Sequence, residues 1–157
     1  MGFIATSYLY EIASNEGIIV ECWDFPKPLD AIYLYQPDLP PTIGISNRIA
    51  SDSPLFRCIL AEELGHHFTS IGKCISHQNM SYHERLGVSK VEYQAVKWAA
   101  ETLLPFQNLK RAIFRERYCS INAMAEYFGV TIEMVEFRMR LNDIQNHINN
   151  IKFMVYG

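Results

Sequence analysis

Residues 58–68, Cys-Ile-Leu-Ala-Glu-Glu-Leu-Gly-His-His-Phe, constrain the fold of this chain more than any other stretch. On a helix, residues four apart share a face, which predicts an apolar ladder of Phe56, Leu60, Leu64 and Phe68. Two carboxylates and two imidazoles flank this ladder within about one and a half helical turns. Burying such groups unpaired is costly, and a divalent metal would offset the cost. We therefore expect one helix that supplies both core and site residues.

Two helices are predicted to carry this site. Ser53 followed by Pro54 is typical of an N-cap and a first helical position, so the first helix should begin near residue 54 and end around residues 71–72. The second should run from residue 91 to the proline at 105, and its apolar stripe continues backwards onto Glu92. The intervening residues, 72–90, show no sustained periodicity, and a loop of that length in a compact domain is usually functional or mobile.

The spacing of the polar residues in the first helix indicates a metal site. A zinc peptidase needs three protein ligands, an open coordination position for water and a carboxylate beside that water. A helix can supply two ligands at positions i and i+4 and the base at i+1, usually as His-Glu-x-x-His. Here the same positions hold Glu62, Glu63 and His66, so glutamate replaces the first histidine. Glu92 is the best candidate for the third ligand.

The change at Glu62 affects which metal the site should prefer. A carboxylate oxygen binds zinc at roughly 2.0–2.2 Å, but an anion in place of a neutral imidazole lowers the net charge of the site. The bound water should then be less acidic, or a harder metal such as manganese should be favoured. Zinc is the expected ion, with manganese or another divalent metal as the alternative.

Several other residues are accessory candidates. His67 is expected to pack or to support the site, because it shares a row with Glu63 that points away from Glu62 and His66. The loop histidines could be idle, replace the missing imidazole or polarise a scissile carbonyl, and a residue of the loop or of the second helix could stabilise the oxyanion. These candidates are His77, His83, Tyr82 and Tyr93.

The remaining chain predicts a mostly helical α+β domain. A short helix is expected over residues 3–15, followed by strands at 18–23, 31–35 and 42–46 in a small, mostly antiparallel meander or a mixed sheet. Prolines before the third strand favour a place at the sheet edge, where it could pair with an extended substrate. Residues 120–128 and 132–142 predict a helix-turn-helix-like segment, with Thr131 as the N-cap of its second helix.

Size and charge limit the organisation and the partners. At 157 residues, the chain should form one compact domain, with a core over residues 1–107 and a helical segment over 108–157 packed on it. The formal net charge of −3 offers no overall field for nucleic acid or an anionic membrane, although residues 108–117 carry a local excess of basic groups. Four scattered cysteines and the absence of a long apolar run favour a reduced, cytoplasmic protein without a membrane span.

Residues 59–68 and the Glu-x-x-Ala-x-x-Trp-Ala-x-x-x-Leu-x-Pro pattern at 92–105 resemble the ImmA/IrrE family of small metallopeptidases. The match spans about residues 50–105 and departs from the family at Glu62, where the first metal-binding histidine is usual. The resemblance implies a gluzincin-like fold, Glu92 as the third metal ligand and a protein substrate, which in several members is a repressor encoded next door. It is also compatible with a phage or mobile-element origin and the helix-turn-helix-like ending.

Two other functions remain open at this point. Because of Glu62, the chain could be a degenerate, non-catalytic member that binds a regulator of a phage or mobile-element circuit without cutting it. A DNA-binding regulator is the third hypothesis, but the second helix of the helix-turn-helix-like segment places two glutamates beside its two arginines. A helix that reads DNA is normally more basic, so a structural or repressor-docking role is preferred.

Overall fold

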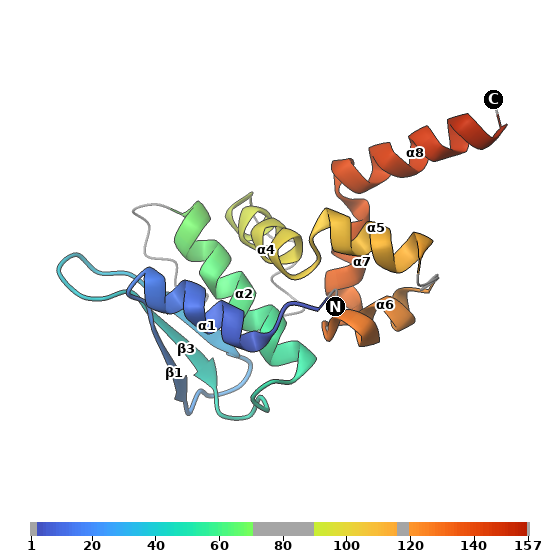
Figure 1. Cartoon of the computed structure of the whole chain (residues 1–157). Coiled ribbons are helices and arrows are strands. Elements are labelled where there is room, and N and C mark those ends of the chain that lie inside the picture. The colour runs from blue at the N-terminus through green and yellow to red at the C-terminus, as the bar shows by residue number, and fades with distance from the viewer. Residues whose placement is uncertain (1–2, 71–89, 116–119, 157) are drawn as a thin grey trace.

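A computed structural model describes residues 3–70, 90–115 and 120–156, with side chains up to residue 149. The described elements follow one another as a first helix, three strands and a series of further helices (Figure 1). Their bounds are α1 Thr6–Asn15, β1 Ile19–Trp23, β2 Ala31–Leu34, β3 Thr42–Ser46, α2 Pro54–Thr69, α4 Lys90–Leu103, α5 Phe106–Phe114, α6 Ile121–Phe128, α7 Ile132–Arg140 and α8 Asn142–Tyr156. The expected α+β fold, mostly helical with a small sheet, is confirmed.

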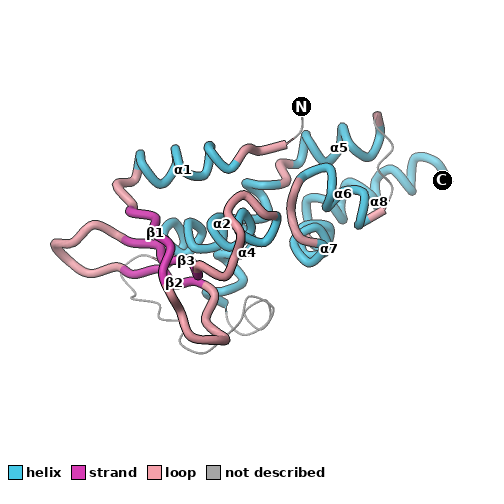
Figure 2. Tube along the Cα trace, turned by 90° about the horizontal axis from the view of Figure 1, so that it is seen from below, coloured by secondary structure: helices cyan, strands magenta, loops and turns pink. Residues whose placement is uncertain are grey.

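The sheet is mixed, with strand order β1-β3-β2. Strand β3 pairs in parallel with β1 and antiparallel with β2, so the meander prediction is wrong. The edge position predicted for β3 is also wrong, because β3 is the central strand (Figure 2). The prolines do not prevent this, since both precede the strand and the Pro41 carbonyl accepts a hydrogen bond from the Ile19 amide at 2.9 Å. Substrate pairing along β3 is therefore excluded, because both of its edges are occupied.

Helix α2 lies at the centre of the molecule. It packs against α1, α4, β2 and β3, and every residue from Phe56 to His66 is buried. The predicted ladder is therefore only one part of a helix that is enclosed on all sides along most of its length. Glu62, Glu63 and His66 are therefore part of the interior and do not form a solvated polar face beside the core stripe.

Local sequence signals explain where α2 begins. The Ser53 hydroxyl accepts a hydrogen bond from the Phe56 amide at 3.1 Å, and Pro54 occupies the first turn. This confirms the predicted N-cap. At the other end α2 finishes at Thr69, with Ser70 as its C-cap, slightly earlier than the expected end around residues 71–72. Residues 71–89, which include most of the predicted loop, lie outside the described part.

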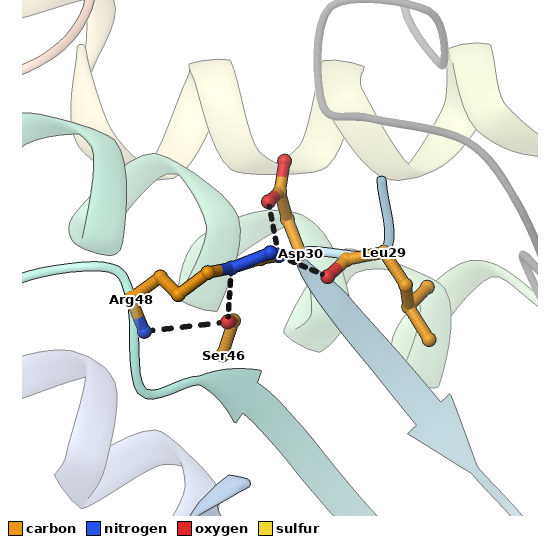
Figure 3. Close-up of polar contacts among 4 residues, drawn as sticks. All are labelled: Leu29, Asp30, Ser46 and Arg48. Atoms are coloured by element: carbon orange, nitrogen blue, oxygen red, sulfur yellow. Dashed lines mark hydrogen bonds and ion pairs between the residues drawn. The ribbon is translucent and has the colours of Figure 1, made fainter. Parts of the chain in front are cut away.

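Arg48, which follows β3, links the last residue of β3 to the residues just before β2 (Figure 3). Arg48 donates from Nη2 to the Leu29 carbonyl at 2.7 Å and to Asp30 Oδ1 at 3.3 Å, while its Nε donates to the Ser46 hydroxyl at 3.1 Å. These bonds fix the entry to β2 beside the exit from β3. They also fix the direction of the chain that leads into α2.

The C-terminal helices contain the predicted helix-turn-helix-like arrangement. Helix α6 ends at Gly129, which adopts a left-handed φ of 58°, and the Thr131 hydroxyl accepts a hydrogen bond from the Met134 amide at 3.2 Å. The predicted N-cap is confirmed. Helix α7 ends earlier than expected, because Leu141 is extended and α8 begins directly after it. Helix α8 and most of α5 fall within the helical segment predicted over residues 108–157, but their individual bounds were not predicted.

A buried arginine connects this part to α2. The Arg57 guanidinium donates to the Ile4 carbonyl and to the Phe128 carbonyl at the C-terminal end of α6, and it lies 4.0 Å from the centre of the Phe3 ring. A cation at a helix C-terminus is favourable.

The division of the chain at residues 107 and 108 stays a prediction. Within the described residues, none of the helices is both long enough and apolar enough to cross a bilayer.

A second buried arginine fixes the junction of α7 and α8, and it carries a pH prediction. Arg138 donates from Nε to the Leu104 carbonyl at 2.9 Å and forms a two-pronged contact with Asp143 at 2.8 and 2.7 Å. We expect Asp143→Asn to lower the free energy of unfolding at neutral pH by about 1–3 kcal/mol, because a buried guanidinium then faces a neutral amide. Urea denaturation of both proteins measures the difference.

The sign of the pH dependence follows from the same contact. The hydrogen bond from Arg138 lowers the pKa of the Asp143 carboxyl in the folded protein. Its stabilising contribution is therefore complete above the unfolded value of about 3.9 and is lost as the pH falls through the folded pKa. The difference in free energy of unfolding between the parent and Asp143→Asn should therefore become smaller only in that acid range. If this difference stays constant down to strongly acid pH, the assigned contact between Arg138 and Asp143 is contradicted.

Candidate metal centre

Helix α2 supplies two of the candidate ligands from consecutive turns. Glu62 and His66 are four residues apart, so they lie on one row of the helix, and both side chains are fully buried. Glu92, which is only 5% exposed, comes from the first turn of α4. The three residues the sequence named as ligands therefore lie in one interior position between two helices.

The ligand atoms of these three side chains lie close to one another. One ligand atom from each of Glu62, His66 and Glu92 lies within 4.8 Å of the others. His66 Nε2 and Glu92 Oε2 are 3.4 Å apart. Ligand atoms at roughly 2.0–2.2 Å from one ion are at most about 4.4 Å apart. The donor set suits a divalent ion, and the three ligand atoms lie close enough together to face a single ion.

Gly65 allows the two helices to approach closely enough for this convergence. A Cβ atom at Gly65 would lie 2.4 Å from the Ala95 carbonyl oxygen, which is backbone of α4. Gly65 directly precedes His66, and Ala95 is one turn beyond Glu92. A close contact between α2 and α4 therefore lies beside the candidate ligands, and it requires a residue without a side chain.

Glu63 lies beside the ligand row. It is fully buried and follows Glu62 directly, so its side chain leaves the helix about 100 degrees round the axis from that of Glu62. A buried carboxylate next to a three-ligand group has the composition expected of a general base near a metal. The sequence argument for Glu63 therefore remains compatible with the structure.

His67 faces a different set of neighbours. Its Nδ1 lies 2.8 Å from the Tyr33 hydroxyl of β2, and its Nε2 lies 3.4 Å from Glu16 Oε2 at the end of α1. Burial raises the pKa of Tyr33 to about 12, so the phenol keeps its proton and shares a hydrogen bond with Nδ1. His67 is outside the ligand group and packs where α2 meets the sheet and α1, while a role in supporting the site stays a prediction.

The other accessory candidates are placed only in part. Tyr93 is 47% exposed and its ring packs against Phe137 of α7, with 5.5 Å between ring centres. It is not among the residues that form the three-ligand group. His77, Tyr82 and His83 lie outside the described residues, so their proposed roles stay predictions.

Sequence reasoning missed two features of this region. One is the contact of His67 with Tyr33 and Glu16, for which the sequence offers no signal, since the three residues come from separate elements. The other is the role of Gly65. A lone glycine inside a strongly predicted helix is a known sign of close packing, so this signal was present.

Comparison with known proteins agrees with this geometry. A family model described as the IrrE N-terminal-like domain, of the M78 peptidases, matches residues 14–140. That match includes the strands, α2, α4 and the helix-turn-helix-like segment. A comparison with curated proteins found no significant match. Since the family match spans most of the sequence and contains all four central residues of the site, the chain belongs to the IrrE N-terminal-like family of M78 metallopeptidase domains.

Proposed function

We propose that this protein is a metal-dependent endopeptidase that cleaves a regulatory protein, with a transcriptional repressor as its substrate. One observation carries the proposal. The buried side chains of Glu62, His66 and Glu92 lie close together, next in sequence to the buried Glu63, in a chain that belongs to a peptidase family. Three side chains of ligand type with an adjacent buried carboxylate have the composition of a hydrolytic metal site.

Each residue has a distinct role in this proposal. Glu62, His66 and Glu92 hold the metal. When bound, the metal supplies a Lewis acid that makes water more acidic and polarises a carbonyl group. Glu63 accepts the proton of the attacking water and returns it to the leaving amine, which is general base and then general acid catalysis. Burial of the four side chains limits competing water and strengthens their electrostatic interactions.

The donor set is more negative and richer in oxygen than that of the usual motif. Two carboxylates and one imidazole carry two negative charges, whereas two imidazoles and one carboxylate carry one. Zinc accepts either set, while oxygen-rich sites also suit manganese. We propose zinc as the resident ion and manganese as the competitor that a titration must include.

Metal binding is the first test. After treatment with a chelator, the full chain should take up about one equivalent of zinc or manganese in a calorimetric titration. Glu92→Gln should weaken binding by at least about 100-fold, more than the roughly 10- to 100-fold loss caused by removing a supporting residue. Glu101→Gln, on the exposed part of the same helix, is the matched control. Uptake of less than about a tenth of an equivalent would contradict the proposal.

A second candidate function is favoured by Glu62. Glutamate in the place of the first histidine is compatible with a non-catalytic member that binds its regulatory partner without cutting it. Incubation of the metal-loaded chain with the transcriptional regulator encoded beside its gene separates the two. Cleavage that a chelator abolishes supports the peptidase, whereas a stable complex with the intact regulator supports the binding protein.

A further inference from the structure

An apolar groove lies among the C-terminal helices, away from the candidate metal centre. It encloses about 210 Å³, and its walls come from α5, α6, α7 and α8. Most of the lining is aliphatic, aromatic or methionine side chain. The lining includes Phe106, Lys110 and Phe114 of α5 and Ile144 and Ile148 of α8.

The side of the groove formed by α5 is basic. Lys110 and Phe114 line both the groove and a neighbouring surface that includes Arg111 and Arg115. Helix α5 contains no acidic residue. Within residues 3–70, 90–115 and 120–149, no ion pair involves Lys110, Arg111 or Arg115. The apolar groove therefore lies beside basic side chains whose charge is not neutralised by an ion pair within the described part of the chain.

The groove is accessible from outside. Phe114, at the end of α5, is 52% exposed, although aromatic side chains are usually buried when the fold can cover them. Helix α8 leads away from the other helices toward the C-terminus, so its far end does not cover the groove (Figure 1). An apolar channel with a charged edge is a common form of helix-binding groove.

We propose that this groove binds an amphipathic helix of a partner protein, whose apolar face is flanked by Asp or Glu. Apolar side chains of that helix would fill the space between α5 and α8, and its acidic residues would lie along Lys110, Arg111 and Arg115. Apolar contact supplies most of the affinity, and the charges select the partner and its direction. The inference goes beyond the proposed function, because it requires no metal and no hydrolysis.

The observations favour this occupant over nucleic acid. A nucleic-acid site gains affinity from many phosphate contacts, whereas here three basic side chains edge a channel that is mainly apolar, on a chain with a net charge of −3. Arg138, one of the two arginines in α7, is buried and bound to Asp143, which leaves it unable to contact a phosphate.

Selection of peptides against the full chain tests the inference. The probe is a phage-displayed library of random peptides of about four helical turns. Enriched peptides should show apolar residues at helical spacing with Asp or Glu beside them. Their affinity should fall by about fivefold to tenfold in Lys110→Glu and by about tenfold or more in Phe114→Ala. It should be unchanged in Lys97→Glu, an equal charge reversal on α4 outside the groove.

Other results would overturn the inference. The inference is wrong if the selection enriches no peptides with Asp or Glu beside apolar residues at helical spacing. It is also wrong if the selected peptides bind Lys110→Glu as tightly as the parent. Two further outcomes assign the surface to another occupant. Binding of a random-sequence DNA duplex at physiological salt that Lys110→Glu abolishes indicates nucleic acid. A dimer in sedimentation that Phe114→Ala dissociates indicates a second copy of the chain. Because Phe114 is exposed, its loss should leave the fold intact.

Discussion

Glu63→Gln is expected to abolish cleavage of the regulatory substrate while leaving metal binding intact. Glutamine keeps the shape of this fully buried side chain but cannot accept the proton of the attacking water. General base catalysis typically contributes about 10²- to 10⁴-fold to a rate. The rate constant for cleavage should therefore fall by at least about 100-fold. Single-turnover cleavage of the regulator, followed by gel electrophoresis, measures the change.

The value of this variant depends on its comparison with the ligand variants. Glu62→Gln and Glu92→Gln should lose metal and activity together, because they remove proposed ligands. Glu63→Gln should separate the two properties, with a metal titration like that of the parent. Glu101→Gln removes an equal charge from the exposed surface of α4 and should cleave normally. If Glu63→Gln cleaves at the parent rate, Glu63 is not the general base.

The helices that carry the site were predictable because their signals are local. Ser53 and Pro54 define the start of α2, and Pro105 follows the end of α4, where the apolar stripe ends. The stripe also placed Glu92 on the inner side of its helix, where the structure finds it. Capping residues and periodicity act within a few residues of one another. Such features can be inferred without knowing how the helices pack.

The sheet order was not predictable in the same way. Each strand is four or five residues long, and so short a run carries no information about which neighbour it pairs with. Prolines before β3 favoured an edge position, but Pro41 lies outside the strand and supplies only its carbonyl to Ile19. Strands β2 and β3 pack against α2 and β1 packs against α1, and such contacts between distant segments are a property of the assembled core.

The bounds of α5 and α8 were not predictable, for separate reasons. Helix α5 has apolar residues at Phe106, Leu109 and Ile113, but a helix of 9 residues shows this period over only about two and a half turns. Helix α8 begins after a single extended residue, Leu141, in a stretch with no glycine or proline to mark a break. The contact between Arg138 and Asp143 stabilises that junction, and it forms only when both helices are in place.

Gly65→Ala is expected to lower both the stability of the fold and its affinity for metal. In a helix interior, alanine is normally more favourable than glycine by about 1 kcal/mol, so propensity alone predicts stabilisation. Here the new Cβ would lie 2.4 Å from the Ala95 carbonyl oxygen. This neighbour is backbone and cannot rotate away, so α4 must move from α2. Overpacking of a core typically costs about 1–3 kcal/mol.

The direction of that movement connects stability to the site. Glu92 is on α4, while Glu62 and His66 are on α2, so separation of the helices lengthens the distances within the ligand group. Urea denaturation should show a lower free energy of unfolding than the parent, and calorimetry should show weaker metal binding by the variant that remains folded. Gly65→Val should have larger effects of the same sign, because its side chain is larger and branched at Cβ. A Gly65→Ala protein that is more stable than the parent and binds metal equally well would show that helix propensity dominates at this position. The close contact between α2 and α4 would then not be what positions Glu92.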